Sequence, residues 1–97
     1  MSKNMQELIK HRSEIVNLVA QYGAGNPRVF GSVLSGTARP DSDVDLLVSW
    51  LQPHSLLDRI ALKQDLEELL HQPVDLIPEH TLHWYVRDKV LQEARPL

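Results

Sequence analysis

The run VDLLVSW at residues 44–50 constrains the fold more than any other part of this 97-residue chain. Its nearly continuous apolar residues predict a strand buried on both faces, in the interior of a sheet. Two aspartates, Asp43 and Asp45, lie one residue apart at its start. Alternate residues of a strand point to the same face, so both carboxylates are expected on one side. Two carboxylates so close repel each other and are costly to desolvate, which favours a cation beside them.

Apolar periodicity and chain breakers predict the elements around this strand. The expected elements are helices over about residues 2–22, 32–35, 56–70 and 85–94, and strands over 28–31, 44–50 and 73–77. The Gly- and Pro-rich residues 23–27 predict a loop, and residues 79–82 a turn. In the helix at 56–70, we expect Leu56, Leu57 and Ile60 to face inward with the other apolar residues. This order predicts one small α/β domain over residues 1–97, with strand directions left open.

Charge and composition exclude several classes of function. The net charge of −3 makes direct binding of free nucleic acid through a basic face unexpected. The absence of cysteine excludes disulfides, zinc knuckles and thiol chemistry. No apolar run is long enough to cross a bilayer, and the amphipathic N-terminus does not resemble a signal peptide. We therefore expect a cytoplasmic protein without a membrane partner.

A third acid and a Gly-Ser pair extend the candidate site. Asp75, in the sequence PVDLI, takes a similar place in the next predicted strand. Three carboxylates converging from two neighbouring strands suit a two-metal site for phosphoryl or nucleotidyl transfer. Gly31 and Ser32 follow the preceding strand, where a glycine lets a phosphate approach the backbone and the serine adds a hydroxyl donor. The N–H groups of a short helix after them would also suit a phosphate.

Each of these features also has an ordinary interpretation. A Gly-Ser pair after a strand is more often only a turn, and Asp-Ser-Asp before a strand is common in loops. Asp75 could be an edge residue that faces water. Two other motifs are excluded, because Thr37 stands where a P-loop needs lysine and Leu46 where an EF-hand needs glycine.

The combination is far more specific than its parts. Gly31-Ser32, ten further residues and then Asp43-Val44-Asp45 resemble the GS-x10-DxD signature of the polymerase-β-like nucleotidyltransferase superfamily. The surrounding text FGSVLSGTARPDSDVDLLV resembles its minimal nucleotidyltransferase (MNT) branch, and PVDLI resembles the position of the third acid of that branch. The resemblance implies the nucleotidyltransferase fold, an α+β arrangement with a small mixed sheet flanked by helices.

The resemblance also implies a reaction and roles for individual residues. The family binds a nucleoside triphosphate with Mg²⁺ and transfers a nucleoside monophosphate to a hydroxyl, releasing pyrophosphate. For this chain we expect ATP as the substrate, two Mg²⁺ ions and transfer of AMP. Gly31 and Ser32 would contact the triphosphate, and Asp43 and Asp45 would ligate metal. Asp75 would ligate the second metal or act as base towards the acceptor hydroxyl. Another candidate for phosphate or partner binding is Arg39, whose ordinary interpretation is a solvated loop charge.

Minimal members are commonly paired with a HEPN-type protein. The resemblance therefore implies a hetero-oligomer in which this chain is the antitoxin and adenylylates a tyrosine of a HEPN ribonuclease toxin. Two alternatives stay open. The chain could neutralise the toxin by steric binding without catalysis, or it could act on a small molecule, as aminoglycoside-modifying nucleotidyltransferases do.

The remaining polar and aromatic residues carry weaker signals. Five histidines are spread along the chain, and we expect surface positions for them and no zinc site. Trp84 and Tyr85 are expected in the core, with a partner contact as the alternative. Acidic residues of the second long helix are expected to form a solvated face; these are Asp65, Glu67 and Glu68.

Overall fold

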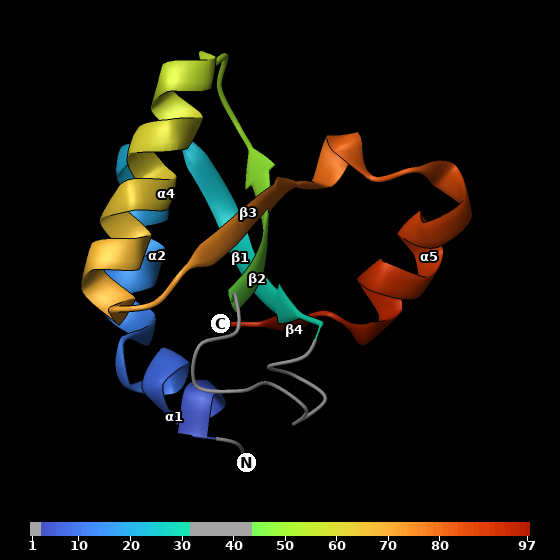
Figure 1. Ribbon diagram of the computed structural model, residues 1–97. Helices are drawn as coiled ribbons and strands as arrows, with labels where there is room; N and C mark the ends of the chain where they lie inside the picture. Colours follow the sequence, from blue (N-terminus) through green and yellow to red (C-terminus); the bar gives the residue numbers. More distant parts are fainter. Residues whose placement is uncertain (1–2, 32–43) are drawn as a thin grey trace.

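The computed structural model describes residues 3–31 and 44–97 (Figure 1). Its elements are α1 Lys3–Lys10, α2 Arg12–Gln21, β1 Ala24–Phe30, β2 Val44–Trp50, α4 Leu56–Leu70, β3 Val74–Pro78, the 3-10 helix η1 Glu79–Thr81, α5 Trp84–Glu93 and β4 Arg95–Pro96. The four strands form one sheet in the order β3-β2-β1-β4. The short helix expected over residues 32–35 lies outside the described residues.

The sheet is mixed. β2 pairs with β1 in antiparallel fashion and with β3 in parallel, and β4 adds to the other side of β1. The predicted fold class, an α+β domain with a small mixed sheet flanked by helices, is therefore confirmed. The strand at residues 44–50 has the predicted bounds and the predicted interior place in the sheet.

Helices α1, α2 and α4 cover one face of the sheet, and α5 stands on the other side (Figure 1). Alternation along β2 divides its residues between the two faces, since successive side chains of a strand point to opposite sides. Val44, Leu46 and Val48 belong to the core beneath the helices. Asp45 and Ser49 project from the opposite face, which we call the open face. The core residues are Leu8, Ile15, Val19, Ala24, Val29, Val44, Leu46, Val48, Leu62, Leu66, Leu70, Val74 and Leu76.

The helix stops before residues 23–27 as predicted, but residues 24–27, expected in a loop, are the start of β1. The register with β2 shifts between Gly25 and Arg28, which indicates a bulge. Asn26 adopts a φ of 52°, a left-handed conformation that asparagine tolerates. Pro27 lacks an N–H but its carbonyl still accepts from the N–H of Leu97, at 3.0 Å. The bulge thus places turn-forming residues inside a seven-residue strand.

The helices differ from expectation in two respects. The segment expected as one helix is divided at His11 into α1 and α2. α4 has the predicted bounds and begins with a capping box, in which Ser55 and Asp58 bond each other's backbone N–H. Its inward face is different, because Leu56 and Leu57 are 68% and 76% exposed. Ile60 is also exposed. The buried stripe repeats every four residues, as a helix packed on a sheet requires, and consists of Leu62, Leu66 and Leu70.

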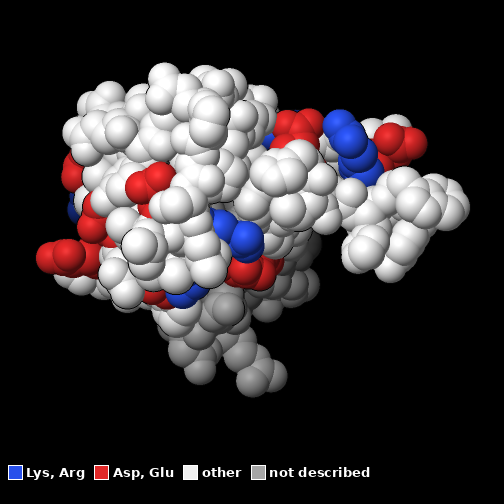
Figure 2. All heavy atoms as spheres, turned by 90° about the horizontal axis from the view of Figure 1, so that it is seen from above, with Lys and Arg blue, Asp and Glu red and all other residues white. Residues whose placement is uncertain are grey.

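α5 packs loosely, and the expectation that its aromatic residues lie in the core was wrong. Trp84 is 84% exposed, Tyr85 is 66% exposed, and no residue of α5 is buried. The smaller lobe that α5 forms stands apart from the rest of the molecule when it is seen from above (Figure 2). In the same view, the surface over the start of α4 is mostly free of charged side chains. No helix in the described part of the chain is long and apolar enough to span a membrane.

Candidate functional site

Two of the predicted acids lie beside each other on the sheet. Asp45 of β2 and Asp75 of β3 are register partners in the parallel pair, whose strands lie about 4.8 Å apart. Their neighbours Leu46 and Leu76 are paired as well and belong to the core. Both aspartates therefore project from the open face. β3 is an edge strand and Asp75 is exposed, so it faces water and also lies next to Asp45.

We call Asp45 and Asp75 the acidic pair. Gly31, at the point where β1 ends, lies against the side chain of Asp45. Its φ of 78° belongs to the left-handed region that favours glycine. A Cβ built at this position would collide with Oδ2 of Asp45 and lie 3.2 Å from its Cγ. Glycine therefore allows a carboxylate to lie against the backbone at the end of β1. The phosphate expected at Gly31 stays a prediction, and the group that lies against Gly31 in the structure is the Asp45 side chain.

Three predicted site residues lie outside the described residues. These are Ser32, Arg39 and Asp43. Their roles stay predictions that rest on the sequence. The structure brings together three of the predicted site residues. Gly31 follows β1, Asp45 lies at the start of β2, and Asp75 lies on β3.

The carboxylate oxygens of the acidic pair are suitable ligands for a magnesium ion. Mg²⁺ is bound in proteins by one or two carboxylates together with substrate phosphates, and Asp45 and Asp75 supply two carboxylates on one face. Within the described ranges, no group of three or more His, Asp or Glu side chains could hold a metal without further ligands. No zinc site is therefore found among the histidines that are described. His54 stacks on Trp50 at a centroid distance of 3.9 Å, and His11 lies 3.3 Å from Glu14.

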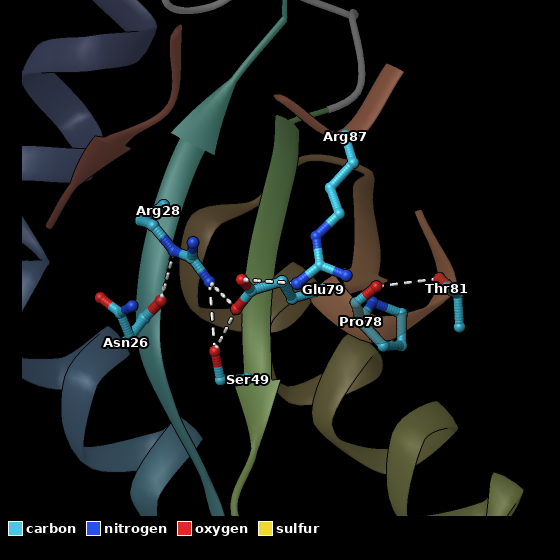
Figure 3. A network of polar contacts seen from close by, with 7 residues as sticks. All are labelled: Asn26, Arg28, Ser49, Pro78, Glu79, Thr81 and Arg87. Atoms are coloured by element: carbon cyan, nitrogen blue, oxygen red, sulfur yellow. Dashed lines mark hydrogen bonds and ion pairs between the residues drawn. The ribbon is translucent and has the colours of Figure 1, made fainter. Parts of the chain in front are cut away.

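A second polar cluster, which the sequence did not reveal, lies further along the open face (Figure 3). Arg28 of β1 bonds Glu79, just after β3, through Nη2 and Oε2 at 2.9 Å. The hydroxyl of Ser49, on β2, donates to the same carboxylate oxygen at 2.7 Å. These bonds, first that from Ser49 and then that from Arg28, lower the pKa of Glu79 below its ordinary value. Arg28 is only 8% exposed, so the carboxylate neutralises a buried charge.

Arg28 also bonds the bulge of β1. Its Nε donates to the carbonyl of Asn26 at 3.1 Å, and its Nη2 to Ser49 Oγ at 3.2 Å (Figure 3). Arg87 of α5 approaches the other oxygen of Glu79 at 4.0 Å. The cluster thus joins β1, β2, the end of β3 and α5. We call Arg28, Ser49 and Glu79 the strand clamp.

An open pocket of about 330 Å³ lies beside the strand clamp. Its lining consists of Ser49, Trp50, Glu79, His80 and Arg87. Ser49 lies four residues after Asp45 on the same face of β2, which is roughly 13 Å along the strand. The pocket is therefore near the acidic pair without including it.

Comparison with known proteins identifies the family of this chain. Residues 7–97 match the model of the nucleotidyltransferase domain family. The protein adenylyltransferase MntA of Thermococcus cleftensis is 40% identical over 87 residues, which cover 90% of this chain and 85% of that protein. A solved structure described as a candidate minimal nucleotidyltransferase is 44% identical, with a TM-score of 0.86, and the match covers 100% of this chain and 97% of that one.

A more distant match shows the fold alone. It is the structure of a tri-AMPylated HEPN toxin of Shewanella oneidensis in complex with its MNT antitoxin. The matched chain is 19% identical, with a TM-score of 0.67, and the match covers 90% of this chain and 68% of that one.

The fold, the acidic pair and the adjacent glycine define a nucleotidyltransferase, and the chain belongs to the nucleotidyltransferase domain family, among its minimal nucleotidyltransferases.

Proposed function

We propose that this nucleotidyltransferase is a protein adenylyltransferase that moves AMP from ATP to a hydroxyl of a HEPN-family toxin, and that it acts as the antitoxin. The observation that carries the proposal is the register of Asp45 with Asp75 on the open face, next to Gly31. The name of the relative from Thermococcus cleftensis supports adenylyl transfer to a protein. The toxin complex from Shewanella oneidensis supports the class of partner.

The proposed reaction is a displacement at the α-phosphorus of ATP. The oxygen of the acceptor hydroxyl forms a bond to the α-phosphorus, while the bond from this phosphorus to the oxygen bridging to the β-phosphorus breaks. Pyrophosphate leaves with that bridging oxygen, and the hydroxyl proton passes to a base. Asp75 is a candidate for this base, because it is exposed on an edge strand, where an acceptor from outside the chain can approach.

Asp43, Asp45 and Asp75 would hold Mg²⁺, which when bound would offset charge on the phosphates and orient the attacking and leaving oxygens. The protein's part is to keep these carboxylates close together despite their mutual repulsion. Gly31 contributes by leaving room for the Asp45 side chain. Ser32 and Arg39 would contact the phosphates.

The open face suits an acceptor carried by another protein. Helices α1, α2 and α4 all lie on the opposite face of the sheet (Figure 1). Exposed aromatic residues of α5 stand on the same side as the open face and offer an apolar contact, with Trp84 84% exposed. An acceptor hydroxyl carried by another protein would approach the acidic pair at Asp75, which is its exposed member.

The proposal is tested by following label from ATP into a HEPN-family toxin. We expect radioactivity from α-labelled ATP to appear on the toxin, and none from γ-labelled ATP, because AMP is transferred and pyrophosphate is lost. Label from the γ-position would contradict adenylyl transfer. An inhibited toxin without any label would favour the steric antitoxin, and label on an aminoglycoside alone would favour a small-molecule enzyme.

A further inference from the structure

The strand that carries Asp75 is an edge strand of only five residues, and it has one neighbouring strand, β2. Its register with β2 decides whether Asp75 lies beside Asp45, because a slip by one residue would turn its side chain to the other face. Short edge strands are weakly held by their ladder alone. The contacts that hold β3 in place therefore bear directly on the geometry of the acidic pair.

Side chains of α4 form hydrogen bonds with backbone groups on the outer edge of β3, on both sides of Asp75. The backbone N–H of Val74 donates to Oε2 of Glu67 at 3.0 Å. The carbonyl of Leu76 accepts from Nη2 of Arg59 at 3.3 Å. Lys63 lies between these two on the helix, at four-residue spacing from each, and pairs with Glu67 at 3.1 Å. Glu67 and Arg59 thus bond backbone groups that an edge strand would otherwise present to water.

The strand clamp holds the other end of β3. The strand ends at Pro78, which has no N–H to donate to a ladder. Directly after it, the Glu79 carboxylate bonds Ser49 of β2 and Arg28 of β1, at 2.7 and 2.9 Å (Figure 3). The side chain thereby ties the end of β3 to both inner strands, across the point where the backbone ladder stops.

We propose that Glu67 and Glu79 are positioning residues, which hold β3 at its two ends so that Asp75 stays beside Asp45. Neither carboxylate touches the acidic pair, and each acts through the backbone that carries Asp75. The inference rests on the proposed role of Asp75 in holding metal. It assigns a function to Glu67, which was expected to lie on a solvated acidic face, and to Glu79, which the sequence did not single out.

The first test compares Glu67→Ala with Glu68→Ala. Both variants remove one glutamate from the same turn of α4, but Glu68 is exposed and only Glu67 bonds Val74. We expect Glu67→Ala to raise the Kd for Mn²⁺, measured by electron paramagnetic resonance with a non-hydrolysable ATP analogue present, by about tenfold or more. It should also accelerate hydrogen exchange at the Val74 amide. Glu68→Ala should leave both quantities unchanged.

Two more variants separate positioning from general stability. Glu67→Gln keeps an oxygen that can accept from the Val74 N–H, so it should restore most of the Mn²⁺ affinity. Glu79→Ala should raise the Kd for Mn²⁺ as Glu67→Ala does, although it lies at the other end of the strand. Irreversibly misfolded protein would bind fewer ions with an unchanged Kd, and reversible unfolding would raise the Kd only by the inverse of the folded fraction, which circular dichroism measures. A misplaced Asp75 should raise the Kd beyond that factor.

Asp75→Asn distinguishes failure of this inference from failure of the proposed function. If Asp75→Asn loses Mn²⁺ affinity while Glu67→Ala and Glu79→Ala bind as Glu68→Ala does, the positioning role is overturned and the metal site stands. If Asp75→Asn binds Mn²⁺ and transfers AMP as the unaltered protein does, the proposed role of Asp75 is wrong, and the positioning role falls with it.

Discussion

Asp45 and Asp75, thirty residues apart in the sequence, are register partners on adjacent parallel strands of one sheet. Parallel pairing with a shared register places both carboxylates on the same face, at the same height along their strands. Two carboxylates so placed repel each other, which favours a cation beside them. The pair therefore suits the Mg²⁺ that we propose for this minimal nucleotidyltransferase, because Mg²⁺ is bound by one or two carboxylates together with phosphates.

Replacing Asp45 tests whether the acidic pair serves catalysis. Asp45→Asn removes a proposed metal ligand and relieves repulsion with Asp75, so the melting temperature should stay the same or rise. The transfer rate should fall by more than about 100-fold, because the ligand stabilises charge that develops in the transition state. The measurement pairs thermal unfolding with a transfer assay.

The matched control is Asp88→Asn, which removes one exposed carboxylate from α5. It should transfer AMP at the rate of the unaltered protein. Full activity in Asp45→Asn would show that this residue does not ligate the metal.

Gly31 is predicted to be irreplaceable even by alanine. Gly31→Ala would place a Cβ against the Asp45 carboxylate in a backbone conformation with positive φ. The free energy of unfolding should drop by more than about 1 kcal/mol, and the displaced carboxylate should lower activity as well. Gly25→Ala is the control, because its Cβ would meet only the flexible end of Leu51, at 3.0 Å. Equal losses in the two variants would contradict a special role for Gly31.

Acid should weaken the fold through two glutamates whose pKa is lowered. The Val74 N–H, followed by Lys63, lowers the pKa of Glu67, and Ser49 and Arg28 lower that of Glu79. In the unfolded chain these carboxyls would titrate near their ordinary value of 4.5. The native state therefore binds fewer protons, and its stability is complete above that value and is lost as pH falls through the lowered pKa.

The pH dependence is measured by denaturant unfolding between neutral and acid pH. Glu79→Gln should be less stable than the unaltered protein at neutral pH, because it leaves the buried Arg28 without its counter-charge. It should also lose less stability on acidification, since one titrating carboxyl is gone. A variant with an unchanged dependence on pH would rule out a contribution from Glu79.

The inward face of α4 gives a prediction about stability. Leu66 is fully buried in the core, whereas Leu57 is 76% exposed. Leu66→Ala should lower the free energy of unfolding by about 2–5 kcal/mol, and Leu57→Ala should change it by less than about 0.5 kcal/mol. Chemical denaturation of the two variants measures both values. A large loss in Leu57→Ala would mean that the first turn of α4 packs inward after all.

Local patterns in the sequence were sufficient for several elements. The apolar run of β2 and the apolar periodicity of α4 are both short-range signals, and both elements have the predicted bounds. The alternation that places Asp45 opposite the core is likewise a property of one strand. The acidic pair could therefore be predicted once Asp75 was placed at a similar position in the next predicted strand, and the resemblance then supported it.

Other features depend on contacts between distant residues. Arg28, Ser49 and Glu79 are separated by 21 and 30 residues, and no local pattern indicates that they meet. The breakers before Arg28 predict a loop by composition, but the bulge accommodates them within β1 because β2 and β4 pair on either side. Trp84 is apolar and was expected in the core, yet no residue of α5 is buried.

The most direct test of the central claim is the intact mass of the HEPN-family toxin after incubation with this protein, ATP and Mg²⁺. The account predicts that the toxin gains the mass of one or more AMP units. It also predicts no gain when the Asp43→Asn/Asp45→Asn double variant replaces the unaltered protein. A toxin that is bound and inhibited without any gain in mass, or one that gains AMP equally with the double variant, would contradict catalysis at the acidic pair.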